Sequence, residues 1–122
     1  RSYKEGGLET LNDSCYKILL THNPAHWVEE VEPQTNIDLT LSGHTHAMQA
    51  MVTVGDWKWS PAKWRYDLWG GLYTNGANVP EYLYVNIGVG EVGIPSRIGA
   101  VPEVTLITLR RWENLTVPKA EK

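Results

Sequence analysis

Two histidines, His44 and His46, stand one residue apart in the stretch SGHTHAMQA, residues 42–50. In extended backbone, residues i and i+2 point to the same face and lie about 6–7 Å apart, for a rise of ~3.3 Å per residue. That separation suits two imidazoles that each reach one of two neighbouring metal ions. The pair is therefore predicted to bind metal, and Gly43 would let the backbone turn sharply where the preceding strand ends.

The flanking sequence predicts the elements that must position these histidines. Residues 15–21 and 37–43 are short apolar runs without helical spacing, which predicts two buried strands. Between them, residues 22–33 are typical of a loop followed by a short helix, with Asn23 as N-cap and Pro24 at the first helical position. A strand, a helix and a strand in this order predict a βαβ unit with parallel strands.

A third histidine, His22, directly follows the first predicted strand. Because the carboxyl ends of parallel strands meet at one edge, His22, His44 and His46 are predicted to converge there. The plainer interpretation is that they are surface or capping histidines. The fourth histidine, His26, is expected on the face of the helix, and Asn23 stands where a zincin motif has its glutamate.

The chain offers few carboxylates that suit a metal centre. A dinuclear centre needs them, including one that bridges the metals, because three neutral imidazoles do not balance two divalent cations. No aspartate has the context of a bridging ligand; the candidates are Asp13, Asp38, Asp56 and Asp67. Two alternatives stay open at this point: one metal ion held by all three histidines, as in a three-histidine zinc site, or half of a dinuclear site.

The rest of the chain predicts a sheet-dominated α/β protein with long loops. Strands are expected at 82–88 and 104–112, whereas 47–57 is ambiguous between strand and helix. The other segments are expected to be irregular: the Trp-rich stretch 57–73, the Asn75-Gly76 turn and the Gly/Pro-rich stretch 88–103.

Composition narrows the class of protein. The chain has 122 residues, 42% of them hydrophobic, which is enough for one domain with a core. Its net charge of −3 argues against a nucleic-acid partner, and it lacks an apolar run long enough to span a membrane. The only cysteine, Cys15, excludes an intrachain disulfide and fits a reducing compartment. We expect an irregular N-terminal segment at 1–14, a domain over 15–116 and a C-terminal tail at 117–122.

Two polar residues are candidates for substrate binding. Arg97 could contact a phosphate bidentately, and Asn86 lies at the end of a predicted strand; a surface arginine and an asparagine that satisfies backbone groups are the plainer interpretations. Residues 88–93 match G-x-G-x-x-G, but Pro95 prevents the helix that a dinucleotide fingerprint must open. We expect a tight loop there, with close backbone approach near the site.

Aromatic and basic residues are interleaved within 57–73, where Lys58, Lys63 and Arg65 separate several tryptophans. The plainer interpretation is that the aromatic rings cover the core. They could also form an amphipathic patch that faces a membrane interface or a lipid-like substrate. This pattern supports a second class of function, a non-catalytic module that binds sugars or lipid headgroups.

Four stretches together resemble the C-terminal half of the calcineurin-like metallophosphoesterases. They are ILLTHNP (18–24), IDLTLSGHTHAMQ (37–49), YLYVNIGVG (82–90) and PEVTLITLRR (102–111). The WKWSP, RY and GLY elements within 57–73 resemble the branch of the family found in membrane-anchored bacterial proteins. The resemblance covers roughly residues 15–111, and it implies an αββα sandwich with two metal ions at the sheet edges.

The family's ligands carry over at three positions only. His22 and His44 resemble the two histidines on the second metal, and His46 resembles a ligand of the first. The family's D-x-H, G-D-x-x-D and G-N-H motifs, which precede these, are not in this chain, and Gly55-Asp56 comes after G-H-T-H, in the wrong order. The resemblance therefore implies a C-terminal fragment that is inactive alone.

The resemblance also implies partners and cofactors for the complete protein. It would hold two divalent ions, Mn, Fe or Zn, and hydrolyse phosphomono- or diesters; the fragment would bind one ion or none. The parent protein is expected to be membrane-associated through segments that this chain lacks, and the chain itself to be soluble. Because an exposed strand edge invites pairing, a homodimer of the isolated chain is also predicted.

Overall fold

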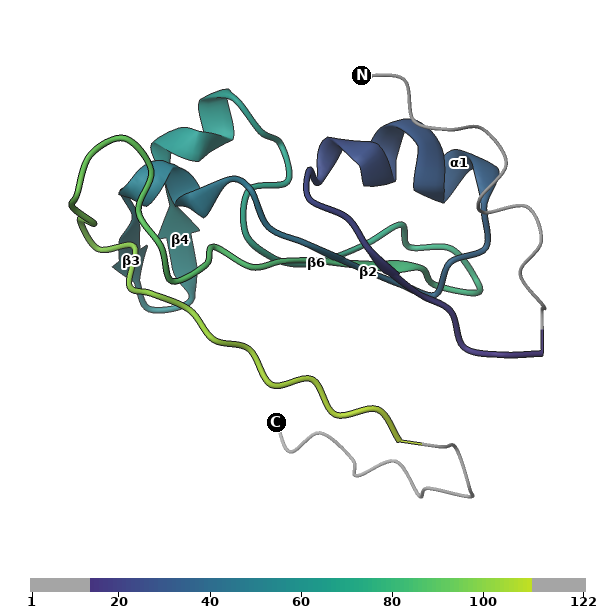
Figure 1. Cartoon of the computed structure of the whole chain (residues 1–122). Coiled ribbons are helices and arrows are strands. Elements are labelled where there is room, and N and C mark those ends of the chain that lie inside the picture. The colour runs from purple at the N-terminus through teal and green to yellow at the C-terminus, as the bar shows by residue number, and fades with distance from the viewer. Residues whose placement is uncertain (1–13, 111–122) are drawn as a thin grey trace.

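The computed structural model describes residues 14–110, and within them the strands form two sheets (Figure 1). The larger sheet has the order β1-β2-β6-β5, and the smaller pairs β3 with β4. The strand bounds are β1 Ile18–Leu20, β2 Leu39–Ser42, β3 Val52–Val54, β4 Trp57–Trp59, β5 Gly71–Thr74 and β6 Tyr82–Val85. The predicted sheet-dominated α/β character with long loops is confirmed.

One helical segment lies over a single face of the larger sheet. It consists of a π-helical turn, η1 (Trp27–Val31), that continues into α1 (Glu32–Gln34). The side chain of Asn23 accepts a hydrogen bond from the Ala25 N–H at 3.0 Å, so the predicted cap is confirmed. The helix ends at Gln34, one residue later than predicted, because the proline at position 33 fits within the last turn.

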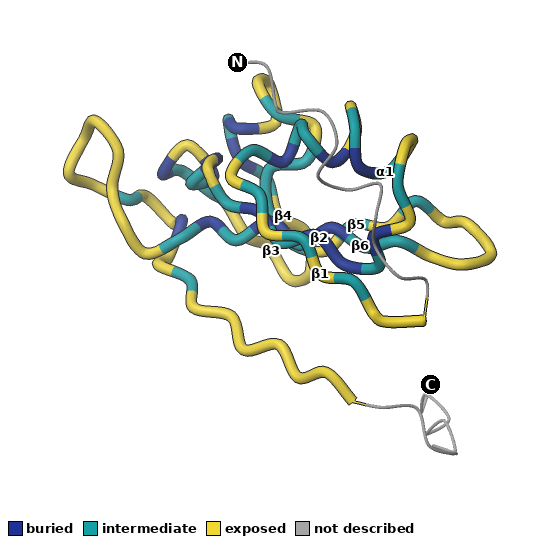
Figure 2. Tube along the Cα trace, turned by 45° about the vertical axis from the view of Figure 1, so that its right-hand side comes forward, coloured by how far each residue is buried: buried dark blue, intermediate teal, exposed yellow. Residues whose placement is uncertain are grey.

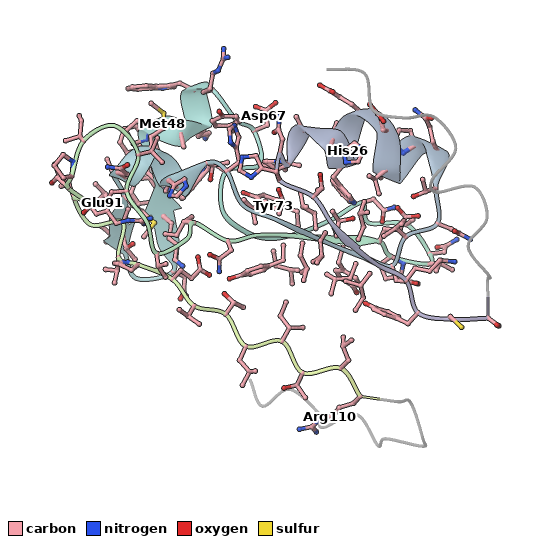
Figure 3. All side chains as sticks on the ribbon, viewed as in Figure 1. His26, Met48, Asp67, Tyr73, Glu91 and Arg110 are labelled. Carbon is pink, nitrogen blue, oxygen red and sulfur yellow. The ribbon has the colours of Figure 1, made fainter. Side chains whose placement is uncertain are left out.

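The predicted βαβ unit is confirmed. Strand β1 pairs in parallel with β2, β2 pairs in parallel with β6, and β5 runs antiparallel to β6. The core lies between the helix and this sheet and consists of Trp27, Val31, Ile37, Leu83 and Val85. Figure 3 shows side chains filling this layer, with Tyr73 of β5 packed against it.

The prediction that the first strand is buried is wrong. Ile18 and Leu20 in β1 are 44% and 75% exposed, because β1 is the outer strand of the sheet among the described residues. The prediction for the next strand holds, since Leu39, Thr40 and Ser42 of β2 are buried between two neighbours. The homodimer stays a prediction, and the β1 edge is where such pairing would form.

The ambiguous stretch 47–57 divides into two elements. A short 3₁₀ turn, η2 (His46–Gln49), precedes the β3–β4 hairpin, which closes over Gly55 and Asp56. Gly55 has a φ of 59°, as a two-residue hairpin turn requires. The prediction that the Trp-rich stretch 57–73 is irregular is wrong, because it contains β4, η3 (Pro61–Trp64) and the start of β5. The Ser60 hydroxyl caps the first turn of η3.

The strand predicted at 104–112 is wrong over 104–110, which has no regular structure; positions 111 and 112 lie outside the described residues. The apolar alternation is present, but the segment runs away from the body of the protein and has no strand beside it among the described residues (Figure 2). Val104 and Leu106 are therefore 88% and 91% exposed. The predicted irregular loop at 88–103 is confirmed. The predicted terminal segments fall mostly outside the described residues.

Glu103 fastens the start of this segment to β6. Its carboxylate accepts hydrogen bonds from the Tyr84 hydroxyl, from the Thr105 hydroxyl at 3.0 Å and from the Ile87 N–H at 3.2 Å. Burial alone would raise the pKa of this carboxyl, but the three hydrogen bonds lower it, and the net shift of the pKa is downward.

The Glu103 carboxylate makes stability depend on pH in a defined direction. Because its pKa is lowered by folding, its contribution is present above the pKa of an unfolded glutamate, about 4.3, and is lost as the pH falls through the folded value. Glu103→Gln should therefore lower the free energy of unfolding at neutral pH. In acid, the difference in unfolding free energy between the variant and the parent chain should become smaller. Denaturant unfolding at several pH values measures this, with exposed Glu91→Gln as control. A difference that does not vary with pH would contradict the assignment.

Candidate functional site

The chain makes a left-handed turn immediately after β2. His44, His46, Ala47, Met48 and Gln49 have φ values of 71°, 50°, 49°, 46° and 58°. This region costs a non-glycine residue roughly 1–2 kcal/mol, so the surrounding contacts must hold the turn in place. Backbone strain of this kind clusters at functional sites.

The left-handed turn corrects the predicted geometry of the histidine pair. His44 and His46 do not share one face of an extended strand, because β2 ends at Ser42 and the backbone reverses its twist at once. Gly43 does not supply the sharp turn, since its φ is not positive; the non-glycine His44 does. The predicted i, i+2 separation therefore does not apply.

His44 lies between two other polar rings. Its Nδ1 is 2.9 Å from Nε2 of His22, and its Nε2 is 3.1 Å from the hydroxyl of Tyr66. Partial burial lowers the pKa of His44, and the nearby His22 and His46 lower it further. His44 is therefore held as a neutral imidazole at neutral pH, the form that binds metal.

The His22–His44 pair brings together two ring nitrogens that could both bind one metal ion. Nδ1 of His44 and Nε2 of His22 lie 2.9 Å apart, and a neutral imidazole nitrogen is a common metal ligand. The two residues come from the ends of neighbouring parallel strands, β1 and β2, as predicted. The backbone confirms this placement, since the Gly43 N–H donates to the His22 carbonyl at 3.2 Å.

His46 points to a different neighbour. Its Nδ1 lies 3.2 Å from Nη2 of Arg97, and because a guanidinium only donates, this nitrogen is the acceptor and the neutral ring carries its proton on Nε2. Across residues 14–110, no three His, Cys, Asp or Glu side chains are grouped so that they could hold one ion. This arrangement gives no support to a single three-histidine zinc site.

The structure places the two candidate substrate residues in internal contacts. Arg97 donates to the carbonyls of Ile87 and Ala100 at 3.0 and 3.2 Å and also contacts Gly90. Asn86 accepts from the Gly88 N–H at 2.7 Å, and its amide donates to Thr105. Both side chains shape the loop; their role toward a substrate stays a prediction.

The remaining two predictions around the site hold. The expected close backbone approach occurs at Gly88, where a Cβ atom would lie 3.4 Å from Cε1 of His46 and φ is 71°. His26 lies on the helix as predicted. Its Nδ1 is 3.0 Å from the Thr21 hydroxyl, and its Nε2 is 3.5 Å from the Glu30 carboxylate. It takes no part in the His22–His44 pair.

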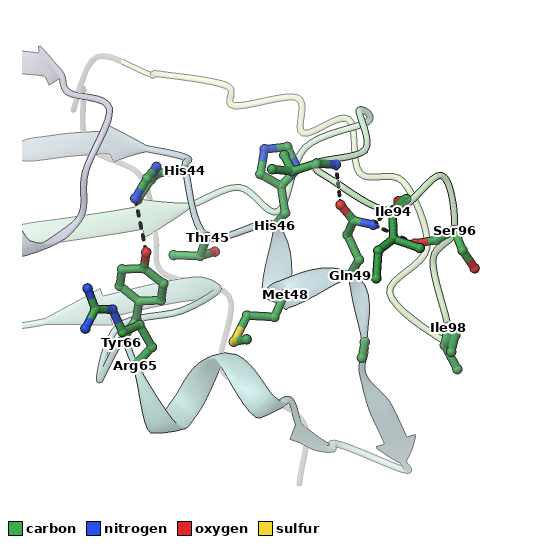
Figure 4. A pocket seen from close by; sticks show the side chains of 12 residues that line it. His44, Thr45, His46, Met48, Gln49, Arg65, Tyr66, Ile94, Ser96 and Ile98 are labelled. Carbon is green, nitrogen blue, oxygen red and sulfur yellow. Dashed lines mark hydrogen bonds between the residues drawn. The ribbon is translucent and has the colours of Figure 1, made fainter.

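A cleft of about 570 Å³ opens beside His44 and His46 (Figure 4). The turn 46–49 forms its floor, Arg65 and Tyr66 stand at one side, and the loop around Ile94 and Ile98 forms the other. Sequence reasoning placed Tyr66 only in the aromatic cluster of the Trp-rich stretch and did not predict its contact with His44. It lies within the Trp-rich stretch, and nothing in its spacing indicates contact with a histidine 22 positions away.

Gln49 holds the far wall of the cleft in place. Its side-chain amide donates to the carbonyls of Ile94 and Ser96, both at 2.7 Å, and its carbonyl accepts from the Val92 N–H. Its backbone also accepts from the Ile98 N–H at 2.8 Å. Sequence reasoning missed this residue as well, although a buried amide in the apolar run AMQAMV is a signal for such a role.

The chain has relatives among known proteins. It is 34% identical to an uncharacterized metallophosphoesterase of Bacillus subtilis (strain 168), over 87% of this chain and 35% of that protein. It is 32% identical to a transmembrane protein with metallophosphoesterase domain of Bos taurus, over 87% of this chain and 22% of that protein. It is 33% identical to an uncharacterized metallophosphoesterase of Helicobacter pylori, over 84% of this chain and 25% of that protein.

The chain thus spans about a third or less of the length of these relatives. No family model matches it, and no solved structure matches it significantly.

The contacts of Gln49 predict a local effect on stability. Gln49→Glu replaces two N–H donors with a carboxylate that faces the Ile94 and Ser96 carbonyls, which should cost about 1–3 kcal/mol. Amide hydrogen exchange across 92–98 should accelerate, whereas exchange in β2 and β6 should change little. The matched control is Gln34→Glu, since Gln34 is exposed and, within residues 14–110, its side chain makes a single hydrogen bond of 3.5 Å. Unchanged exchange in 92–98 would show that the wall does not depend on Gln49.

Proposed function

Because this chain belongs to the calcineurin-like metallophosphoesterase family, we propose that it supplies His22, His44 and His46 to a dinuclear centre that hydrolyses phosphate esters. One observation carries the proposal: the 2.9 Å approach of His22 Nε2 and His44 Nδ1 at adjacent strand ends. The two ring nitrogens that form this hydrogen bond are the ones that would hold a shared ion. His46 would join the centre by exchanging its contact with Arg97.

Divalent ions such as Mn, Fe or Zn, when bound, would supply Lewis-acid activation of the phosphate ester. The chain's own residues prepare for that role. His44 is kept neutral by its surroundings, and Tyr66 fixes the ring from the other side through its hydroxyl. Hydrogen bonds of this kind orient metal ligands and set their tautomer. Arg65, at the rim of the cleft, is placed to pair with a phosphate.

We place the complete activity in a longer polypeptide, since the chain covers about a third or less of its relatives. In that polypeptide the larger sheet would form half of an αββα sandwich, and further ligands would complete the two-metal centre. Some vertebrate relatives are named transmembrane proteins, and we propose that the parent protein is also membrane-associated. Across residues 14–110, the helices are too short to cross a bilayer.

Metal binding by this chain tests the proposal directly. Titration with Zn²⁺, followed by the ¹⁵N resonances of the imidazoles, should perturb His22 and His44 together. Changes in residues that only orient a ligand typically cost 10–100-fold in metal affinity, so His44→Ala, which removes a ligand, should cost more than about 100-fold. His26→Gln is the matched control and should bind as the parent chain does, because His26 engages Thr21 and Glu30.

Hydrolysis provides the second arm of that test. A longer polypeptide containing this chain, loaded with Mn²⁺, should hydrolyse bis-p-nitrophenyl phosphate, and His44→Ala should abolish turnover. This chain alone should give no turnover. Activity that survives His44→Ala, or zinc that shifts His26 instead of the His22–His44 pair, would contradict the proposal.

A non-catalytic binding module remains the second candidate, and one observation favours it. The register of the β3–β4 hairpin places Val52, Val54, Trp57 and Trp59 on one face, and Trp59 packs edge-on against Trp64 with ring centroids 5.6 Å apart. This face is open to solvent: Trp57 is 57% exposed and Trp64 is 80% exposed. The interpretation that these rings only cover the core holds for Trp69, which packs in the second apolar cluster.

Such a module would bind without metal. Vesicles or immobilised glycans should retain the chain in the presence of a chelator, and Trp64→Ala should release it. Trp64 is the informative position because its ring lies outside the core, so its removal leaves the fold intact. Retention that requires metal, or no retention on either surface, would rule this function out.

A further inference from the structure

The cleft beside the histidines has two chemically different sides. One carries the imidazoles of His44 and His46, the hydroxyl of Tyr66 and the guanidinium of Arg65. The opposite side is formed by apolar side chains: Met48, Val92, Ile94 and Ile98. Figure 4 shows this division, with Tyr66 and Arg65 on one side, Ile94 and Ile98 on the other and Met48 between them.

The polar side of the cleft includes a positively charged side chain, Arg65, whose hydrogen-bond donors are available to a ligand. The Arg65 side chain has no hydrogen bond or ion pair with any residue in 14–110, and it is exposed. Arg97, in contrast, donates hydrogen bonds to backbone carbonyls and to the His46 ring. A guanidinium with free N–H donors binds a phosphate bidentately. Arg65 is therefore the cation in this cleft that is available to an anionic ligand.

The apolar side offers surface but few hydrogen-bonding groups. Gln49 already takes up the Ile94 and Ser96 carbonyls and the Val92 N–H, so the backbone of this wall is largely satisfied internally. The side chains that remain are open to solvent, with Ile94 70% and Ile98 73% exposed. Exposed apolar surface beside polar anchors is the usual composition of a small-molecule site.

The volume of the cleft exceeds the needs of a phosphate group. A water molecule takes about 30 Å³, so a phosphate, with five heavy atoms, would leave most of the 570 Å³ to the rest of the ligand. The part left over lies along Met48, Ile94 and Ile98. A bare phosphate, or an ester of a small polar alcohol, would leave these apolar side chains exposed to water.

We propose that the cleft selects amphipathic phosphate esters, in which the phosphate lies between His44 and Arg65 and an alkyl or aryl group covers Met48, Ile94 and Ile98. This inference rests on the proposed phosphoesterase function for the position of the phosphate. It adds the chemical class of the alcohol, which the histidines do not specify. The same chemistry is found in soluble esters and in lipid phosphates.

Ligand binding to the metal-free chain tests this without any turnover. The probes are inorganic phosphate, methyl phosphate, hexyl phosphate and hexanol, each titrated while ¹H–¹⁵N spectra are recorded. A fully buried methylene contributes about fourfold to affinity, so hexyl phosphate should bind more than about tenfold tighter than methyl phosphate even with partial burial of its chain. Its shifts should map to Met48, Ile94 and Ile98, and hexanol should bind more weakly than hexyl phosphate.

Variants separate the two halves of the cleft. Ile94→Ser should remove most of the advantage of hexyl over methyl phosphate and leave methyl phosphate binding unchanged. Arg65→Gln should weaken both esters equally and leave hexanol unaffected. Val79→Ser is the matched control, because Val79 is also an exposed apolar residue but lies in the β5–β6 loop. Equal affinity for the two esters, or a hexyl advantage that survives Ile94→Ser, would overturn the proposal.

Vesicles of phosphatidylcholine with phosphatidic acid distinguish the source of the ligand. Binding of monomeric hexyl phosphate together with vesicles supports the proposal for lipid phosphates, and binding of hexyl phosphate alone supports it for soluble esters. Vesicle binding without hexyl phosphate binding would overturn it, because the surface and not the cleft would then be recognised. Zinc titration of the His22–His44 pair is a separate readout. If zinc binds this pair but hexyl phosphate shows no advantage over methyl phosphate, the inference about the alcohol fails and the proposed function stands.

Discussion

The turn from His44 to Gln49, in which every residue except Thr45 has a positive φ, is the constraint on which the site depends. Four consecutive non-glycine residues with positive φ, His46 to Gln49, are unfavourable on their own, and the turn persists because its two ends are fixed. At one end β2 is buried between β1 and β6, and at the other the Gln49 amide binds three backbone groups of the loop opposite. The turn separates the two imidazoles, exposes Met48 and sets the width of the cleft.

The separated imidazoles have different chemical states. His44 is bracketed by His22 and Tyr66, and its neutral form is favoured, so either ring nitrogen can be freed by a small movement of a neighbour. His46 accepts from Arg97 and is thereby fixed in one tautomer. A two-metal centre needs ligands directed at two points, and a turn that sends adjacent histidines to different neighbours is compatible with that requirement.

The sequence predicts those features of the fold that are set locally. The Asn23 cap and the parallel βαβ unit depend on residues that are close in the chain, and both are present. At the predicted Asn75-Gly76 turn, Gly76 has a positive φ, but the connection between β5 and β6 is a longer loop over 75–81. The exposure of β1 and the irregular course of 104–110 depend on which strands lie alongside, which an apolar pattern does not specify. The site divides in the same way: His22 and His44 follow from strand ends, whereas Tyr66 and Gln49 reach it through tertiary contacts.

The strand order of the larger sheet has a consequence for how the chain folds. The β3–β4 hairpin closes over two residues and the β5–β6 hairpin over one loop, so both can form early. The pairing of β2 with β6 joins Leu39 to Tyr82 and closes a much longer loop, so we expect it to form later. The left-handed turn lies in that intervening stretch, so we expect the cleft to be completed together with the centre of the sheet.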